Sequence, residues 1–260
     1  MKTSNKRIAL QRIVSFSTLI ILFACGADNG AEPPGDIYAM AVNQPTRSQE
    51  DRESDERRRP YDILRLSGVR PGMVVVDLLG GSGYYSELFN PLVGPDGKVY
   101  LQNNSLFLRF STEGLESRLA DGRLQNVERL DSEFADLALP ENADLIFMGL
   151  SYHDIYVPRE DPVIMTSREE FFPQILASLK TGGKLLVIDH AAAEGSGRSS
   201  APKLHRIEES YAIDDITSAG FKLIGSLDVL RTDTDNYALD IWEDEVYHQT
   251  DRFVLLFEKL

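Results

Sequence analysis

The chain has 260 residues, of which 42% are apolar and 9% aromatic, and its formal net charge is -14 at pH 7. This length and composition suit one globular domain with a substantial core and a tail. The acidic balance argues against nucleic acid as a partner and against a basic patch that binds anionic lipid, while a single cysteine excludes an internal disulfide.

Residues 1–24 are typical of a bacterial export signal. Basic residues precede the uncharged run IVSFSTLIILFA, which is too short to span a bilayer comfortably. The run ends in LFAC, which resembles the lipobox at which lipoproteins are cleaved and acylated. We therefore expect a lipoprotein signal peptide, an acylated Cys25 that attaches the protein to the membrane, and a location in the cell envelope facing the periplasm. Gly26 gives no inner-membrane retention signal, which favours the outer membrane; the alternative for Cys25 is a lone core cysteine.

Residues 25–46 are rich in Gly, Pro, Ala and acids without periodicity, which predicts a flexible tether. The globular domain is then expected over 47–260. Its first part, about 47–70, predicts a helical cap that is densely charged up to Pro60. This charged run is typical of a solvated helical face, and the alternative is that it closes over a ligand site with Asp51, Asp55 and Arg58.

From residue 73 onward strands alternate with helices, a pattern typical of a parallel sheet covered on both faces. Apolar runs predict strands at 73–78, 98–103, 126–131, 143–150, 184–190, 221–231 and 252–260. Helical patterns begin at Tyr84 and cover 104–122, 168–180 and 205–221. No crossover helix separates the last two strands, which predicts a closing antiparallel pair. The predicted class is α/β, a Rossmann-like doubly wound sheet of about seven strands with the last strand antiparallel.

The stretch VVVDLLGGSGYYSELF predicts a ligand-binding turn between the first strand and its helix. Gly80, Gly81 and Gly83 allow positive φ and remove side chains that would block a ligand, and Asp77 can accept hydrogen bonds or face a cation. Residues 84–86 occupy the place of the third glycine in G-x-G-x-x-G. The turn therefore favours an adenosyl sulfonium ligand over a dinucleotide, and the alternative is a tight turn without a ligand.

Several segments in order resemble class I S-adenosylmethionine-dependent methyltransferases, and within them a group of exported bacterial methyltransferases of unknown substrate. The segments are DRESDERRRP, RPGMVVVDLLGGSGYYSE, YHD, LKTGGKLLVIDHAAAEGSG and LHRIEESYAIDDITSAGF, which together span about residues 47–258. The resemblance implies S-adenosylmethionine as cofactor and an unidentified small-molecule methyl acceptor. It also implies that Asp77, Gly81 and Gly83 line the cofactor's amino acid and ribose, that Asp131 lies near the adenine, and that residues after strands four and five face the methyl group.

One departure from the family concerns the end of the second strand. Many class I methyltransferases place an acid there to hold the ribose hydroxyls, whereas this chain has Gln102, Asn103 and Asn104. Amides hydrogen-bond a diol less strongly than a carboxylate does. We expect Gln102 and Asn103 to contact the cofactor with reduced strength.

Histidine is the more informative residue type. Only four occur in the chain, and His153, His190 and His205 follow strand four, end strand five and lie in the next segment. Each has polar neighbours in sequence, namely Asp154, Asp189, and Arg206 with Glu208. We predict that His153, Asp154, Asp189, His190 and His205 form the catalytic site, and the alternative is structural histidines.

Two chemical uses follow from such a cluster. A neutral imidazole oriented by a carboxylate can take a proton from the acceptor. Alternatively, the imidazoles and carboxylates bind a divalent metal, although their spacing is not a recognised metal signature. Export raises a further alternative, because S-adenosylmethionine is made in the cytoplasm: an envelope lipoprotein that keeps the fold but binds another ligand or partner, or catalyses a different histidine-dependent reaction.

Overall fold

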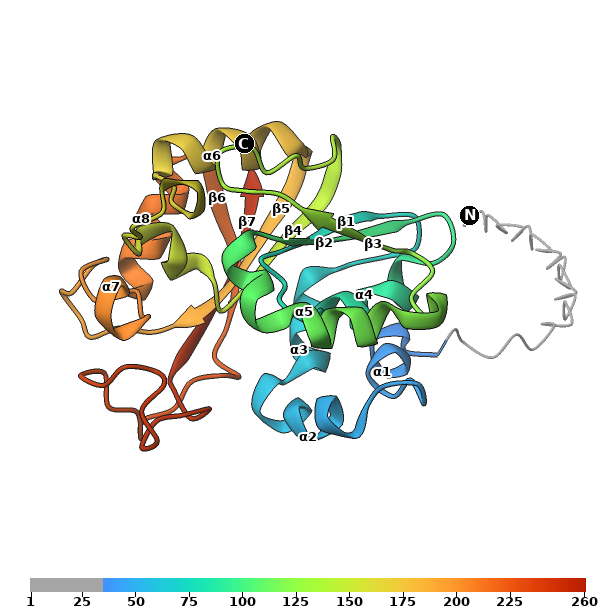
Figure 1. Ribbon diagram of the computed structural model, residues 1–260, viewed down its shortest axis with the longest axis horizontal. Coiled ribbons are helices and arrows are strands. Elements are labelled where there is room, and N and C mark those ends of the chain that lie inside the picture. Colours follow the sequence, from blue (N-terminus) through green and yellow to red (C-terminus); the bar gives the residue numbers. More distant parts are fainter. Residues whose placement is uncertain (1–34) are drawn as a thin grey trace, which may run out of the picture. The chain divides into compact units, whose positions relative to one another are not determined.

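The computed structural model describes residues 35–260, and its strands form one mixed sheet (Figure 1). The strand order is β3-β2-β1-β4-β5-β7-β6, with β1 to β5 parallel and β7 antiparallel to both neighbours. This confirms the predicted fold class. The strands are β1 (Val74–Leu78), β2 (Lys98–Asn103), β3 (Val127–Asp131), β4 (Ala143–Gly149), β5 (Leu179–His190), β6 (Phe221–Leu227) and β7 (Arg252–Lys259).

Helices cover both faces of this sheet, so the central strands are apolar on both sides. Side chains of α1, α3 and α4 form one core cluster with Val75, and those of α6 and α8 form the other with Val76. In the described part of the chain, no helix has the length and apolar character needed to cross a bilayer. The helices are α1 (Ile37–Val42), α2 (Gln49–Arg58), α3 (Pro60–Ser67), α4 (Tyr84–Val93), α5 (Ser105–Leu119), α6 (Arg168–Ser178), α7 (Ala201–Leu204) and α8 (Glu209–Ser218).

The domain begins before residue 47, because α1 lies in the segment that composition assigned to a tether. The Asp36 side chain accepts hydrogen bonds from the backbone of Tyr38 and Ala39 and so caps the helix. Tyr38 and Ala41 are buried, and the Tyr38 hydroxyl donates to the carbonyl of Val69 at 3.3 Å. A helix this short depends on packing, which composition does not reveal. The signal peptide, Cys25 and the first part of the tether lie outside the described residues.

The connection between β6 and β7, residues 228–251, is anchored by a buried ion pair. The guanidinium of Arg206 donates to both carboxylate oxygens of Asp235, at 2.7 and 2.9 Å, and both side chains are fully buried. It also donates to the carbonyls of Ala191 and Leu239. This connection is therefore fixed to the segment that follows β5.

Replacing Arg206 tests that anchor. Arg206→Met should lower the free energy of unfolding by about 3–5 kcal/mol, because it leaves the Asp235 carboxylate buried without its partner. Urea denaturation measures this, and Arg65→Met, at an exposed position of α3, is the matched control. A loss no larger than that of the control would contradict the assigned role.

Candidate functional site

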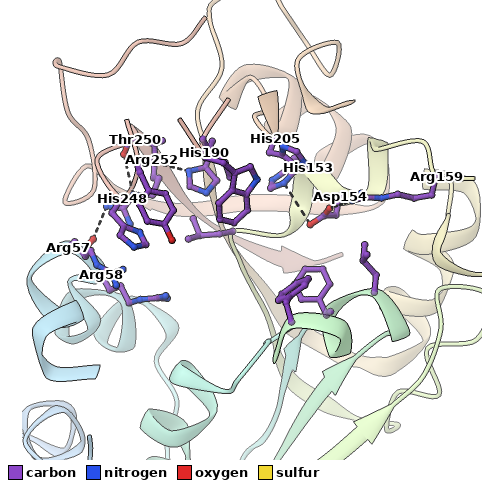
Figure 2. A pocket seen from close by; sticks show the side chains of 17 residues that line it. Arg57, Arg58, His153, Asp154, Arg159, His190, His205, His248, Thr250 and Arg252 are labelled. Carbon is purple, nitrogen blue, oxygen red and sulfur yellow. Dashed lines mark hydrogen bonds and ion pairs between the residues drawn. The ribbon is translucent and has the colours of Figure 1, made fainter. Parts of the chain in front are cut away.

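A cavity of about 320 Å³ opens at the carboxyl edge of the sheet, where β4 and β5 end (Figure 2). Strand β4 is followed, after Leu150 and Ser151, by the short 3-10 helix η2 (Tyr152–Tyr156), which carries His153, and β5 ends at His190. His205 follows α7, and all three histidines line the cavity together with His248. Because β4 and β5 are parallel neighbours, their ends meet at one edge, and the sequence-predicted histidines are brought together there.

The Asp189 carboxylate organises this edge. One oxygen accepts a hydrogen bond from the backbone N–H of His153 at 2.6 Å. The other accepts from the backbone N–H of His190 at 2.7 Å and lies 2.8 Å from Nδ1 of the His153 ring. Asp189 is fully buried, so its charge acts through little water. It therefore fixes both the backbone and the ring orientation of His153.

The His153 ring is an imidazole whose proton affinity is raised by its neighbours. Burial lowers its pKa, but the charges of Asp189 and Asp154 outweigh burial and raise the pKa to about 9. With Nδ1 engaged by Asp189, Nε2 is the nitrogen left for the cavity, and the nearest carboxylate oxygen of Asp154 lies 3.7 Å from it. Asp154 itself pairs with Arg159 at 2.8 Å. This arrangement can accept and release a proton at a fixed position.

The other two rings differ from His153 in their partners. His190 Nδ1 lies 2.7 Å from the Thr250 hydroxyl, and burial holds the pKa of His190 well below its usual value. His205 Nδ1 lies 3.1 Å from a carboxylate oxygen of Asp240. The ring centroids of His190 and His205 lie 6.1 and 5.7 Å from that of His153.

Sequence neighbours are therefore poor guides to these contacts. Asp189, which precedes His190 in sequence, contacts the ring of His153. Arg206, which follows His205 in sequence, pairs with Asp235 and not with His205. His190 and His205 take partners from the connection between β6 and β7.

Two leucines at this edge have strained backbones. Leu79 follows β1 with φ of 54°, and Leu150 follows β4 with φ of 64°. The left-handed region costs a residue other than glycine roughly 1–2 kcal/mol, and residues strained in this way are concentrated at functional sites. Leu150 lines the histidine cavity, so the sharp turn that delivers His153 is held there by the surrounding fold.

The glycine turn after β1 is open at one position and packed at the others. A Cβ at Gly81 would meet nothing within 4 Å, whereas one at Gly80 would lie 2.5 Å from Leu101 and one at Gly83 2.7 Å from it. Asp77 is buried and accepts a hydrogen bond from the Ser86 hydroxyl at 2.7 Å. Burial raises the pKa of Asp77 to about 6. The open approach to this turn is thus at Gly81.

The amides at the end of β2 hold the turn. Gln102 accepts a hydrogen bond from the backbone N–H of Leu79 and donates to Ser132. Asn103 accepts from the N–H of Gly81 and donates to its carbonyl, at 2.8 and 2.9 Å. A cofactor contact by either amide therefore remains a prediction, and it requires these bonds to be shared.

Asp131, the predicted adenine neighbour, ends β3 at the exposed surface. Its carboxylate pairs with Arg129 at 2.7 Å, and its side chain is 41% exposed. The structure does not bring Asp131 into contact with the glycine turn, and its role with the adenine stays a prediction.

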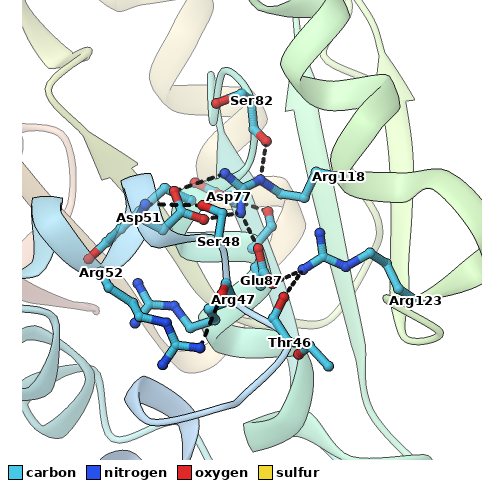
Figure 3. Close-up of polar contacts among 12 residues, drawn as sticks. Thr46, Arg47, Ser48, Asp51, Arg52, Asp77, Ser82, Glu87, Arg118 and Arg123 are labelled. Carbon is cyan, nitrogen blue, oxygen red and sulfur yellow. Dashed lines mark hydrogen bonds and ion pairs between the residues drawn. The ribbon is translucent and has the colours of Figure 1, made fainter.

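A polar cluster from α2 and α5 covers the other side of the glycine turn (Figure 3). The Arg118 guanidinium donates to the carbonyl of Ser82 at 2.6 Å and pairs with Asp51 at 2.7 Å and with Glu87. Asp51 is one of the residues of the charged run that sequence reasoning offered as a cap over a ligand site. The run does lie at the sheet edge, with Asp51 turned to α5 (Figure 3).

Among the arginines of the histidine cavity, only Arg58 was a candidate from the sequence, in the alternative that the charged run closes over a ligand site. Arg57 and Arg58 come from α2 and Arg252 from the start of β7, and all three line the cavity with Arg159. The charged run predicts a solvated helical face, with closure over a ligand site as the alternative, and nothing in its local pattern singles out Arg57 as a residue that faces a cavity. Because α2 packs against the sheet edge, the backbone carbonyl of Arg57 accepts a hydrogen bond from the Arg252 guanidinium at 2.7 Å.

In the described residues, no group of three or more His, Cys, Asp or Glu side chains is arranged to hold a metal ion.

A second, polar cavity of about 300 Å³ lies on the side of the glycine turn that α2 and α5 cover, and Ser82 and Arg118 line it. Arg57 and Arg58 line both cavities, so the glycine turn and the histidine cluster flank the same two side chains.

This strand order, with a glycine turn after β1 and an antiparallel β7, is the fold of class I S-adenosylmethionine-dependent methyltransferases. A SAM-dependent methyltransferase from Aquifex aeolicus superimposes with a TM-score of 0.57 at 21% identity, over 80% of this chain and 93% of that one. No family model matches the sequence.

Curated relatives that are similar to the chain in sequence are named as methyltransferases. The chain is 29% identical over 170 residues to the ubiquinone/menaquinone biosynthesis C-methyltransferase UbiE of Ectopseudomonas mendocina, covering 65% of this chain and 59% of the relative. It is 28% identical over 163 residues to UbiE of Hydrogenovibrio crunogenus, covering 62% of this chain and 56% of the relative. The chain thus matches less than two thirds of the length of these relatives.

The residues at this edge fit the cofactor of the superfamily. Gly81 leaves open space for close approach of a ligand to the backbone. In the part of the chain that the structure describes, Asn104 Nδ2, Glu133 Oε2 and Ser151 Oγ are buried without a hydrogen-bond partner. These atoms follow β2, β3 and β4, and unsatisfied buried polar groups of this kind are suited to a polar ligand or to water.

The raised pKa of His153 predicts a pH dependence of stability. A histidine with a pKa of about 6.5 unfolded and about 9 folded stabilises the fold fully below pH 6.5, and this contribution is lost as pH rises through 9. At about 1.4 kcal/mol per pKa unit, the loss is roughly 3 kcal/mol.

Urea denaturation between pH 6.5 and 9.5 measures that loss. In His153→Gln the slope attributable to this ring should disappear, whatever the variant's overall stability, because glutamine does not titrate. The matched control is His248→Gln, whose ring is exposed. An unchanged slope in His153→Gln would contradict the assigned pairing with Asp189.

Proposed function

We propose that this chain is an S-adenosylmethionine-dependent methyltransferase that acts on a small-molecule acceptor, with His153 as general base. The observation that supports this most directly is the His153–Asp189 pair beside a cavity at the carboxyl edge, where β4 neighbours β1 and its glycine turn. The sequence similarity to C-methyltransferases supports methyl transfer as the reaction.

The chain's residues have separate tasks in the proposed reaction. Gly81 admits the cofactor to the backbone, and the unpartnered amide of Asn104 is suited to a polar group of it. Asp189 fixes the ring of His153, and Nε2 of His153 takes a proton from the acceptor atom that becomes methylated. When bound, S-adenosylmethionine supplies a methyl group on a sulfonium sulfur, which keeps the bonding electron pair when the acceptor takes the methyl.

His153 must be neutral to accept that proton. Since its pKa is raised to about 9, turnover is expected to rise with pH towards 9. Asp154 contributes to the raised pKa, and His190, kept neutral by burial, adds no competing charge beside the base.

The test combines cofactor binding with turnover. Gly81→Val should abolish calorimetric binding of S-adenosylmethionine and S-adenosylhomocysteine, because a β-branched side chain blocks the approach and disfavours positive φ. His153→Gln should bind both ligands normally and lower turnover by roughly 10² to 10⁴.

Gly72→Val is the matched control, because Gly72 also has positive φ and open space where a Cβ would lie, but it precedes β1, at the opposite end of the strand from the glycine turn. It should bind the cofactor as the wild type does. Wild-type protein that binds neither ligand at millimolar concentration would sink the proposed function.

We also propose that Cys25 is acylated and holds the protein in the cell envelope, facing the periplasm at the outer membrane. The support is the sequence of residues 1–25 alone, a basic start, a short apolar run and the LFAC context. Stable anchoring takes two or more buried chains, which lipoprotein acylation provides.

Membrane fractionation of the full chain tests this location. Cys25→Ser should move the protein from the membrane fraction to the soluble fraction, because it removes the acylated thiol. Ser17→Ala, in the same apolar run, is the control and should leave the distribution unchanged. A Cys25→Ser variant that stays with the membranes would refute acyl anchoring.

A further inference from the structure

We propose that the histidine cavity takes an anionic acceptor, a small molecule with a carboxylate or sulfonate group on an aromatic body. The inference rests on the proposed function, since it names the class of acceptor for the same site. It is opposite to what the overall charge of -14 suggests, and it comes from how the charges are distributed.

The cavity wall is strongly basic. Four arginines line it, and Asp154 is the one acidic side chain among the lining residues. Asp154 is already paired with Arg159. The remaining three arginines form no ion pair with any residue that the structure describes, so three positive charges face one cavity uncompensated: Arg57, Arg58 and Arg252.

The guanidiniums of Arg252 and Arg58 are held in place by contacts that leave N–H groups free. Arg252 donates to the backbone carbonyls of Thr250 and Arg57, which are neutral acceptors. Arg58 stacks over the Tyr84 ring at 4.5 Å, and its Nε is buried without a hydrogen-bond partner in the described structure. Burial lowers the pKa of Arg252, and the charges of Arg58 and Arg57 lower it further. An anion bound between these arginines would relieve the repulsion among their positive charges and accept hydrogen bonds from their free N–H groups.

The rest of the cavity is aromatic. Phe110 of α5 is 70% exposed, and Trp242 and Tyr247 of the connection between β6 and β7 are 62% and 43% exposed. All three line this cavity, together with Phe107. Large aromatic side chains left in water at one place mark a binding surface for an apolar body.

Charge and shape together select the ligand class. A neutral aromatic molecule would fill the apolar walls but leave three like charges unneutralised, whereas a small inorganic anion would leave the aromatic walls in water. A molecule that joins an anionic group to an aromatic body satisfies both. The same basic groups would stabilise an acceptor oxygen as His153 removes its proton.

The experiment compares two probes that differ by one charged group. Anilinonaphthalene sulfonate and uncharged N-phenylnaphthylamine share the same rings, and both fluoresce when they leave water. Each is titrated into the full chain and into Arg58→Gln and Arg57→Gln. Arg65→Gln, exposed on α3, is the matched control. Circular dichroism melting confirms that each variant is folded, and Arg252→Lys is a further variant that keeps the charge.

The sulfonate should bind the wild type at the cavity and lose roughly 10- to 100-fold in affinity in Arg58→Gln and Arg57→Gln, the range for a hydrogen bond to a charged group. The uncharged probe should bind all folded variants alike. Arg252→Lys, which keeps the positive charge, should lose less affinity for the sulfonate than Arg58→Gln and Arg57→Gln do. Equal losses for both probes, or no loss for the sulfonate, would overturn the proposal. Since neither probe needs the cofactor, selective sulfonate binding without S-adenosylmethionine binding would refute the proposed function and leave the anion site standing.

Discussion

The Asp189 carboxylate makes the hydrogen bonds on which the candidate site depends. It lies at the end of β5 and reaches across to the first residues after β4, so one buried charge joins the ends of two adjacent strands. A buried carboxylate must be compensated, and here backbone N–H groups and one imidazole do so. The contacts that compensate the buried charge also set the orientation of His153, so stability and the geometry of the candidate site are coupled in this residue.

Ion pairing determines which charged side chains face the cavity. Within one helix, α2, the acids turn away from the cavity: Asp51 pairs with Arg118 of α5, and Asp55 pairs with Arg47. The neighbouring Arg57 and Arg58 are left to face the cavity. An acidic protein can thus carry a basic site, because net charge reports the whole surface whereas a ligand responds to the groups within a few ångströms.

The middle of the sheet was predictable because its central strands are buried on both faces and appear as apolar runs such as ADLIFMGL, which forms β4. The meeting of His153 with His190 followed from the same rule, since parallel neighbours end at one edge. The partners of those histidines were not predictable, because Asp240 and Thr250 come from a long connection with no periodic pattern. Helix α1 was missed for a related reason, since tertiary packing and not local propensity stabilises it.

The place of β7 in the sheet sets the order in which the molecule can be completed. Strand β5 pairs with β7 from Lys184 to His190, and β7 in turn pairs with β6, so β7 lies between β5 and β6 although it comes last among the strands in sequence. A growing chain that has made β1 to β6 still presents an open edge on β5. The cavity walls built from residues 228–251 are also unfixed until β7 docks. Local folding of the early strands during synthesis therefore cannot complete the cavity, and a chain interrupted before residue 252 keeps the β5 edge unpaired.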